Sequence, residues 1–160
     1  MNNYNAPMLS DPFNALGLRN ISNTKKYYYN CGGYALGTFS WYWPGRTEKE
    51  HEKIMDYAED ENWEPALQLA ADAIINELAG WQLVEIEEII QRHYSPKKYE
   101  VVAMRFCSCD YHFWKLGCNW NWYDKMGNFK HINRHAFNDV MDKRWNHRYY
   151  SPIICFLRMR

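Results

Sequence analysis

Residues 99–124, YEVVAMRFCSCDYHFWKLGCNWNWYD, decide the fold class of this chain. Tyr, Val, Phe and Trp recur along three runs, at 99–107, 110–116 and 119–124, and these residue types favour strands. Short polar breaks separate the runs, so they predict an antiparallel meander. The closing run PIICFLRM, residues 152–159, predicts another strand.

Helical patterns come before these strands. Between Pro65 and Gly80, which suit the first turn and the position just past the end of a helix, four apolar residues recur at helical spacing: Leu67, Ala71, Ile74 and Leu78. A shorter helix is expected over 85–92, where isoleucines form an apolar stripe opposite glutamates. Helices followed by strands predict an α+β fold with the helices packed on one side of an antiparallel sheet.

The length of 160 residues fits one domain, 1–160, built around a single core. The net charge is zero, which offers no electrostatic argument for nucleic acid or an anionic membrane as a partner. From Gly45 to Glu100, six Lys and Arg stand against fourteen Asp and Glu, and such charge runs usually line solvated helices. We therefore expect an acidic helical elaboration at about 45–95.

The start of the sequence, MNNYNAPMLSDPFNALGL, is polar and broken by Pro7 and Pro12, so it does not have the pattern of a secretion signal. No apolar run approaches the roughly 20 residues that a membrane span needs. We expect a cytoplasmic protein that is not bound to a membrane and whose five cysteines are reduced thiols. The first thirty residues predict an extended arm with turns.

The segment NCGGYALG, residues 30–37, carries the first candidate for chemistry. Asn30 is a good N-cap, which makes Cys31 the first residue of a short helix. A helix N-terminus stabilises a thiolate, the nucleophilic form of cysteine. Gly32 and Gly33 are expected to let a substrate approach the sulfur, with Asn30 and both glycines contributing to an oxyanion or substrate site. The open alternative is a structural cysteine in a glycine-rich helix start.

The run DYHFWKL carries the second candidate, His112, among large aromatic residues. Strand alternation sends Tyr111 and Phe113 to the opposite face from His112. A partly buried imidazole needs polar partners. A turn centred on Cys118 predicts that Asp124 lies directly across from His112, with Cβ atoms about 4.5 to 5.5 Å apart. Asp124 is then the expected orienting carboxylate. The open alternative is a core histidine bonded to backbone.

These segments together resemble a known superfamily. NCGGYALG is similar to the D/N-C-S/G-G signature of NlpC/P60-type papain-like peptidases and amidases. More narrowly, NCGGYALG, DYHFWK and WYDKMG resemble the motifs NCxxYALG, DYHFYR and WSHKxG of a group of small bacterial and phage proteins in that superfamily. The closing YYSPIICF is similar to that group's final aromatic strand. One departure is that Asp124 stands where the pattern has the His of WSHK.

The resemblance implies a papain-like fold with an N-terminal catalytic helix, a helical middle segment and a C-terminal antiparallel sheet. It also implies a cysteine-nucleophile hydrolase that needs no cofactor or metal and cleaves an amide or peptide bond through a thioester acyl-enzyme. In that reaction Cys31 is the nucleophile, His112 the base and Asp124 the third member. Cell-wall peptides are one implied substrate class, and a cytoplasmic chain would reach them by lysis or in a phage particle.

Three other interpretations stay open. One is a papain-like protein without turnover, phage-encoded and acting as a binder or inhibitor on a host system. Another is a structural zinc site, although the spacing of its candidate ligands is unusual: Cys107, Cys109, His112 and Cys118. The many aromatic residues also suit base stacking, but core packing is favoured, and no nucleic-acid-binding motif is present.

Overall fold

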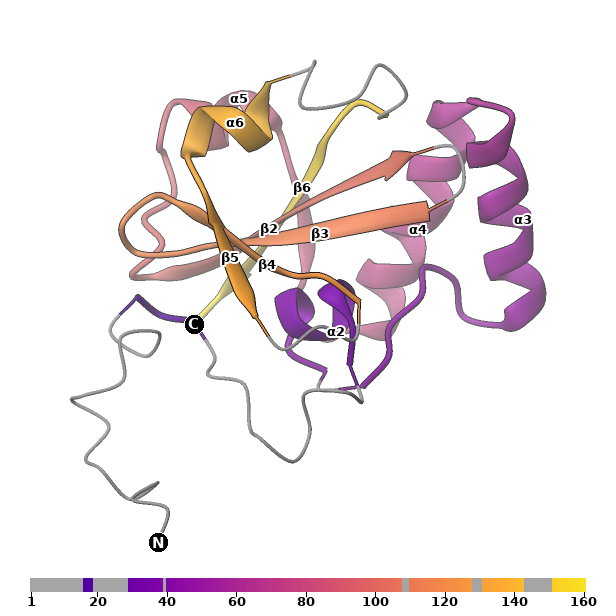
Figure 1. Cartoon of the computed structure of the whole chain (residues 1–160), viewed down its shortest axis with the longest axis horizontal. Coiled ribbons are helices and arrows are strands. Elements are labelled where there is room, and N and C mark those ends of the chain that lie inside the picture. The colour runs from indigo at the N-terminus through magenta and orange to yellow at the C-terminus, as the bar shows by residue number, and fades with distance from the viewer. Residues whose placement is uncertain (1–15, 19–28, 39, 108–109, 128–130, 143–150) are drawn as a thin grey trace, which may run out of the picture.

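The computed structural model describes residues 16–18, 29–38, 40–107, 110–127, 131–142 and 151–160. Within these residues the chain forms a six-stranded antiparallel sheet in the order β1-β6-β2-β3-β4-β5, with helices packed around it (Figure 1). The predicted α+β class is confirmed. Most of the predicted N-terminal arm lies outside the described residues.

The two longest strands have the same bounds as the predicted runs at 99–107 and 110–116. Their bounds are β1 (Gln82–Val84), β2 (Tyr99–Cys107), β3 (Asp110–Leu116), β4 (Trp122–Lys125), β5 (Ile132–His135) and β6 (Ile154–Met159). The last strand in the sequence, β6, lies between β1 and β2 rather than at an edge of the sheet. The edge strands β1 and β5 are only three and four residues long, too short for their alternation to stand out in the sequence.

Two of the described helices, α2 and α3, begin with a side-chain cap. Their bounds are α2 (Cys31–Leu36), α3 (Glu48–Glu59), α4 (Trp63–Glu77), α5 (Ile86–Ile90) and α6 (Phe137–Met141). The hydroxyl of Thr47 caps α3 by accepting from the Glu50 N–H at 3.1 Å. The predicted helices at Pro65 and at 85–92 are present as α4 and α5, whereas α6 was not predicted.

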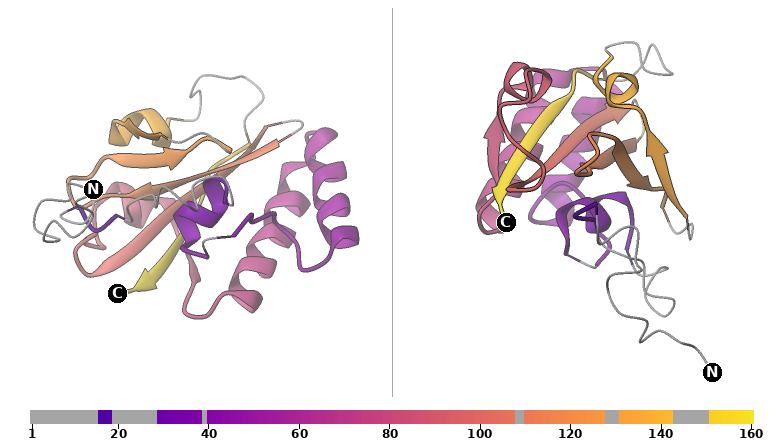
Figure 2. Two further views of the ribbon diagram at one scale, coloured as in Figure 1. Left: turned by 60° about the horizontal axis from the view of Figure 1, so that its bottom comes forward. Right: turned by 90° about the vertical axis from the view of Figure 1, so that its left-hand side faces the viewer.

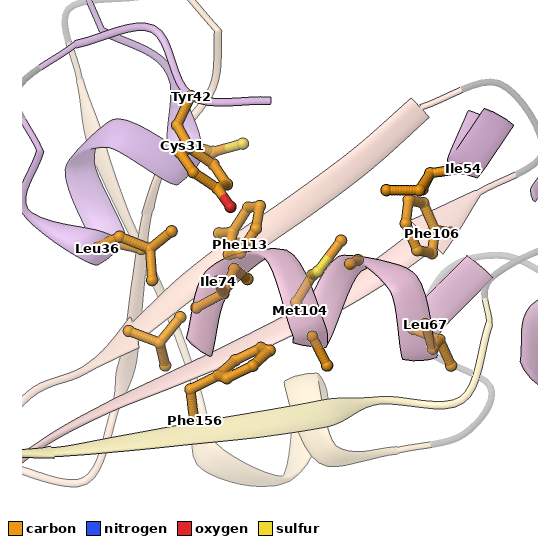
Figure 3. Close-up of a cluster of buried hydrophobic side chains, with 14 of the residues drawn as sticks. Cys31, Leu36, Tyr42, Ile54, Leu67, Ile74, Met104, Phe106, Phe113 and Phe156 are labelled. Carbon is orange, nitrogen blue, oxygen red and sulfur yellow. The ribbon is translucent and has the colours of Figure 1, made fainter. Parts of the chain in front are cut away.

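Both faces of the sheet are covered, so the expectation of helices on one side only is wrong. One core cluster joins α2, α3 and α4 to Met104, Phe113 and Phe156 on one face (Figure 3). A second cluster joins α5 and α6 to Ala103 and Trp114 on the other face. Figure 2 shows α2 and α6 on opposite sides of the sheet. The physical reason lies in β2, where consecutive residues are buried, and a strand that is apolar on both faces needs a layer on each.

A separation between β3 and β4 positions the site. β3 pairs with β2 from Lys115 down to Asp110, which is all of the strand but its last residue. Its pairing with β4 covers only Lys115 with Tyr123 and Leu116 with Trp122. The two strands therefore diverge beyond these pairs, and α2 packs against both of them.

A buried ion cluster fixes α2 against the sheet. The Lys115 ammonium donates to Glu100 and lies 3.5 Å from the Ala35 carbonyl oxygen near the end of α2. Arg158 on β6 completes the cluster, with its Nε donating to Glu100 at 2.6 Å. The compensating charges hold the pKa of Glu100 at about 2 although its burial acts in the opposite direction. The cluster ties α2, β2, β3 and β6 together.

Candidate active site

The predicted start of α2 is confirmed. The Asn30 side-chain oxygen accepts from the Gly33 N–H at 3.1 Å, and Cys31 is the first helical residue. Gly37 ends the helix in the left-handed region, with φ of 73°. Cys31 is only 5% exposed, and Figure 3 shows it beside Tyr42 at the beginning of the helix.

The Asn30 side chain is used entirely within the protein. Its oxygen also accepts from the Tyr42 N–H at 3.0 Å. Its amide nitrogen donates to the Tyr42 carbonyl at 2.7 Å and to the Tyr111 hydroxyl oxygen at 3.1 Å. A carboxamide has two donors and two acceptor positions, so none remains for a substrate. Asn30 therefore positions the helix start and the segment at Tyr42, in place of the substrate contact expected from the sequence.

The glycines that follow are required by close packing. A Cβ atom on Gly32 would lie 2.9 Å from the Tyr42 ring, and one on Gly33 would lie 2.0 Å from the Ser40 carbonyl oxygen. The Gly33 N–H already donates to Asn30. The side-chain positions of both glycines are thus filled by the chain itself, and they are not the open approach to the sulfur that the sequence suggested.

His112 and Asp124 are in contact as predicted, but the register of the two strands differs from the expected one. His112 Nε2 donates to Asp124 Oδ2 at 2.6 Å. The observed pairing of β3 with β4 is displaced by two residues from the expected one, so Asp124 is a diagonal neighbour of His112 on the same face rather than directly opposite. The Trp114 ring packs edge-on against the imidazole, with 4.6 Å between ring centroids.

The surroundings of His112 favour its charged form. Burial by itself lowers the pKa of the imidazole, but the hydrogen bond to Asp124 and the interaction with Cys31 raise it to about 10. Nε2 is committed to Asp124, so Nδ1 is the ring nitrogen left to exchange a proton with Cys31. The side chains of Cys31, His112 and Asp124 are therefore brought together in the order that nucleophilic catalysis requires.

Asp124 is buried and interacts with a second histidine that sequence reasoning missed. His135 Nε2 lies 3.1 Å from Asp124 Oδ1. Burial raises the pKa of the Asp124 carboxyl, but His112 and His135 together lower it to about 2. His135 pairs with Trp122 across the β4–β5 ladder, which places it on the same face as Asp124. Recognising the short strand β5 in the sequence would have found it.

Lys125 is a second group that sequence reasoning missed. It is fully buried, and its ammonium donates to the carbonyls of Tyr29, at 2.6 Å, and Gly127. Burial lowers the pKa of Lys125, and negative charge on Cys31 acts in the opposite direction. This side chain follows Asp124 directly and points to the other face of β4. A positive charge therefore lies near Cys31 on the side of α2.

The alternative zinc ligands are only partly within the described residues, because Cys109 lies outside them. Within the described residues, Cys107 and Cys118 are not joined in a disulfide bond. Among the residues that the structure describes, no group of three or more His, Cys, Asp and Glu side chains is arranged to hold a metal ion.

None of the described helices has the length and apolar character needed to cross a membrane. Comparisons of the chain with protein-family models, with curated proteins and with solved structures found no match.

Proposed function

We propose that this protein is a papain-like cysteine hydrolase that cleaves an amide or peptide bond through a thioester acyl-enzyme. The observation that carries the proposal is the chain of contacts from Cys31 to His112 to Asp124. A helix start, a strand of the central sheet and the diverging neighbour strand each supply one member. The motifs NCGGYALG and DYHFWK, with their similarity to NlpC/P60-type proteins, support the same conclusion.

The reaction begins from the pair in which the proton of the Cys31 thiol has passed to His112 Nδ1, giving the charged imidazole that the hydrogen bond to Asp124 stabilises. The thiolate attacks the carbonyl carbon, a carbon–sulfur bond forms, and the carbonyl oxygen takes the electron pair as an oxyanion. The carbon–nitrogen bond then breaks, and His112 returns its proton to the leaving amine. Water, deprotonated by His112, attacks the thioester, which releases the carboxylic acid and restores the thiol.

Each neighbour of His112 assists one part of this cycle. The Asp124 carboxylate fixes the tautomer with hydrogen on Nε2 and stabilises the imidazolium that forms. The backbone N–H groups of Cys31 and Gly32 lie in the first turn of α2, where an N–H has no acceptor within the helix. They are the donors that we assign to the oxyanion.

The substrate class follows from the resemblance more than from the shape of the site. Cell-wall peptides are one class, and a peptide, isopeptide or small amide of the cytoplasm is the other. The acidic helix α3, which lies beside α4 (Figure 1), is the part of the chain that we assign to specificity.

The test compares wild type with Cys31→Ala on purified cell-wall peptides and on a cell lysate, with released peptides identified by mass spectrometry. Cys118→Ala is a matched control. Cys118 lies in the turn after β3, and its sulfur contacts the Pro96 carbonyl oxygen at 3.7 Å rather than a residue of the proposed site. We expect peptide release by wild type and by the control, and none by Cys31→Ala. Equal release by wild type and Cys31→Ala contradicts the proposal. No release by any of the three favours the binder or inhibitor, which the low exposure of Cys31 also suits.

A further inference from the structure

The Asp124 carboxylate is shared between histidines from two different strands. Oδ2 accepts from His112 Nε2 at 2.6 Å, and Oδ1 lies 3.1 Å from His135 Nε2. The Asp124 side chain is 2% exposed, while that of His112 is 12% and that of His135 is 23% exposed. A buried carboxylate thus stands between a less exposed imidazole at the thiol and a more exposed one toward solvent.

We propose that His135 is a positioning residue, which holds Oδ1 of Asp124 so that Oδ2 faces His112. The consequence for catalysis rests on the proposed function, whereas the coupling of the two histidines through Asp124 does not. The role goes beyond a Cys–His–Asp arrangement, because it adds a fourth side chain that acts only through the third.

The course of the strands explains why Asp124 needs this support. Pairing of β3 with β4 ends at Tyr123, so no strand neighbour on the β3 side fixes the Asp124 backbone. On its other side Asp124 pairs with Asn133, and the neighbouring pair on the same face sets His135 opposite Trp122. His135 is therefore carried by the one strand that stays in register with Asp124, and it approaches the carboxylate from there.

The contact between His135 and Asp124 is short and polar. His135 Nε2 lies 3.1 Å from Asp124 Oδ1, and it helps to hold the pKa of the Asp124 carboxyl low. The contact of His135 with Oδ1 restricts rotation of the carboxylate, which keeps Oδ2 directed at His112.

The experiment measures two properties of the intact protein that need no substrate. One is the titration of the His112 ring by NMR, and the other is the rate of Cys31 alkylation at about pH 6.5. His135→Phe removes the nitrogen and keeps a ring beside Trp122, His135→Ala removes both, and His135→Gln restores a donor. His131→Ala is the matched control, since His131 is exposed just before β5.

We expect His135→Phe and His135→Ala to shift the titration of His112 and to slow Cys31 alkylation by about tenfold, in the range that outer partners of a site usually contribute. His135→Gln should recover most of the rate, and His131→Ala should equal wild type. If His135→Ala fails to fold, His135→Phe and His135→Gln still decide the matter. A His112 titration and a Cys31 rate unchanged in His135→Phe overturn the proposal.

A double-mutant cycle separates positioning from a merely structural role. In the Asp124→Asn background, His135→Phe should change the alkylation rate by less than about twofold, because its effect passes through Asp124. Independent, multiplying losses overturn the proposal. If wild type does not hydrolyse any substrate but the coupling of His135 to His112 is present, only the proposed function is refuted. If wild type hydrolyses its substrate but the coupling is absent, only the role of His135 is refuted.

Discussion

His112 and Asp124 form a hydrogen bond of 2.6 Å across two strands that have already separated. In a regular hairpin such a diagonal pair is about 7 to 8 Å apart at Cα, within reach of long side chains. Here the divergence of β3 and β4 leaves room for α2 to bring Cys31 to the same imidazole. The side-chain hydrogen bond therefore links β3 to β4 just beyond the last pair of their backbone ladder.

Cys31 should be the most reactive of the described thiols, because it lies at the start of α2 in contact with His112, a base that can take its proton. Burial raises the pKa of Cys155 to about 12, so that thiol should be inert. Competitive alkylation at about pH 6.5 with peptide mapping measures the order. Labelling of Cys107 or Cys118 ahead of Cys31 would contradict the assignment of the nucleophile.

Asp124→Asn should keep the fold and reduce turnover roughly 10²-fold or more, because an amide favours the wrong tautomer of His112. The comparison is with Asp110→Asn, an exposed residue at the start of the same strand as His112. Steady-state kinetics on a substrate found in the peptide-release experiment give the ratio. Equal kinetics in Asp124→Asn and wild type would leave a Cys–His pair without a third member.

Stability should depend on pH in a way that the shifted groups determine. The pKa of His112 rises from 6.5 to about 10, so its contribution is complete below about pH 6.5 and is lost as pH rises through 10. The pKa of Asp124 falls from 3.8 to about 2, so its contribution is complete above about pH 3.8 and is lost as pH falls through 2. Urea unfolding across this range measures both limbs. Asp124→Asn should flatten the alkaline limb, and an unaltered limb would contradict the assignment.

Gly33→Ala should destabilise the fold strongly, because the new Cβ would lie 2.0 Å from the Ser40 carbonyl oxygen. Overpacking against backbone costs about 3 kcal/mol or more. Gly127→Ala is the comparison, since nothing lies within 4 Å and only its φ of 50° opposes a side chain, at about 1 kcal/mol. Thermal unfolding gives the two differences. A smaller loss for Gly33→Ala than for Gly127→Ala would contradict the close packing of residues 40–42 on the helix start.

The purified protein should carry no stoichiometric zinc, because His112 directs Nε2 to a carboxylate and its other nitrogen to a thiol. Elemental analysis after dialysis measures the content. A one-to-one content that disappears in Cys107→Ala would favour the metal site over the hydrolase.

Much of the site could be predicted from local chemistry. An asparagine before Cys31 and a glycine at position 37 determine where α2 begins and ends. The face shared by His112 and Asp124 follows from strand alternation, which a displacement of two residues does not alter.

The register of that hairpin was wrong because of the turn. The Gly117 N–H donates to the Asn121 carbonyl at 2.9 Å, and Trp120 adopts a φ of 62°. A bulky residue in the left-handed region is uncommon, so the sequence favoured a turn centred one residue earlier, on Cys118. His135 escaped notice for a different reason, because four residues of β5 carry too little periodicity to predict a strand.

The position of β6 has a consequence for the order of events during synthesis. β1 and β2 are made early, yet each pairs with β6, which is made after every other strand. A nascent chain that has not reached Ile154 therefore presents two open strand edges. It also lacks Phe156, which packs in the same core cluster as α4, and Arg158, which donates a hydrogen bond to Glu100. The core cluster that contains Cys31 is therefore complete only when residues 154–159 have been made and β6 has closed the sheet between β1 and β2.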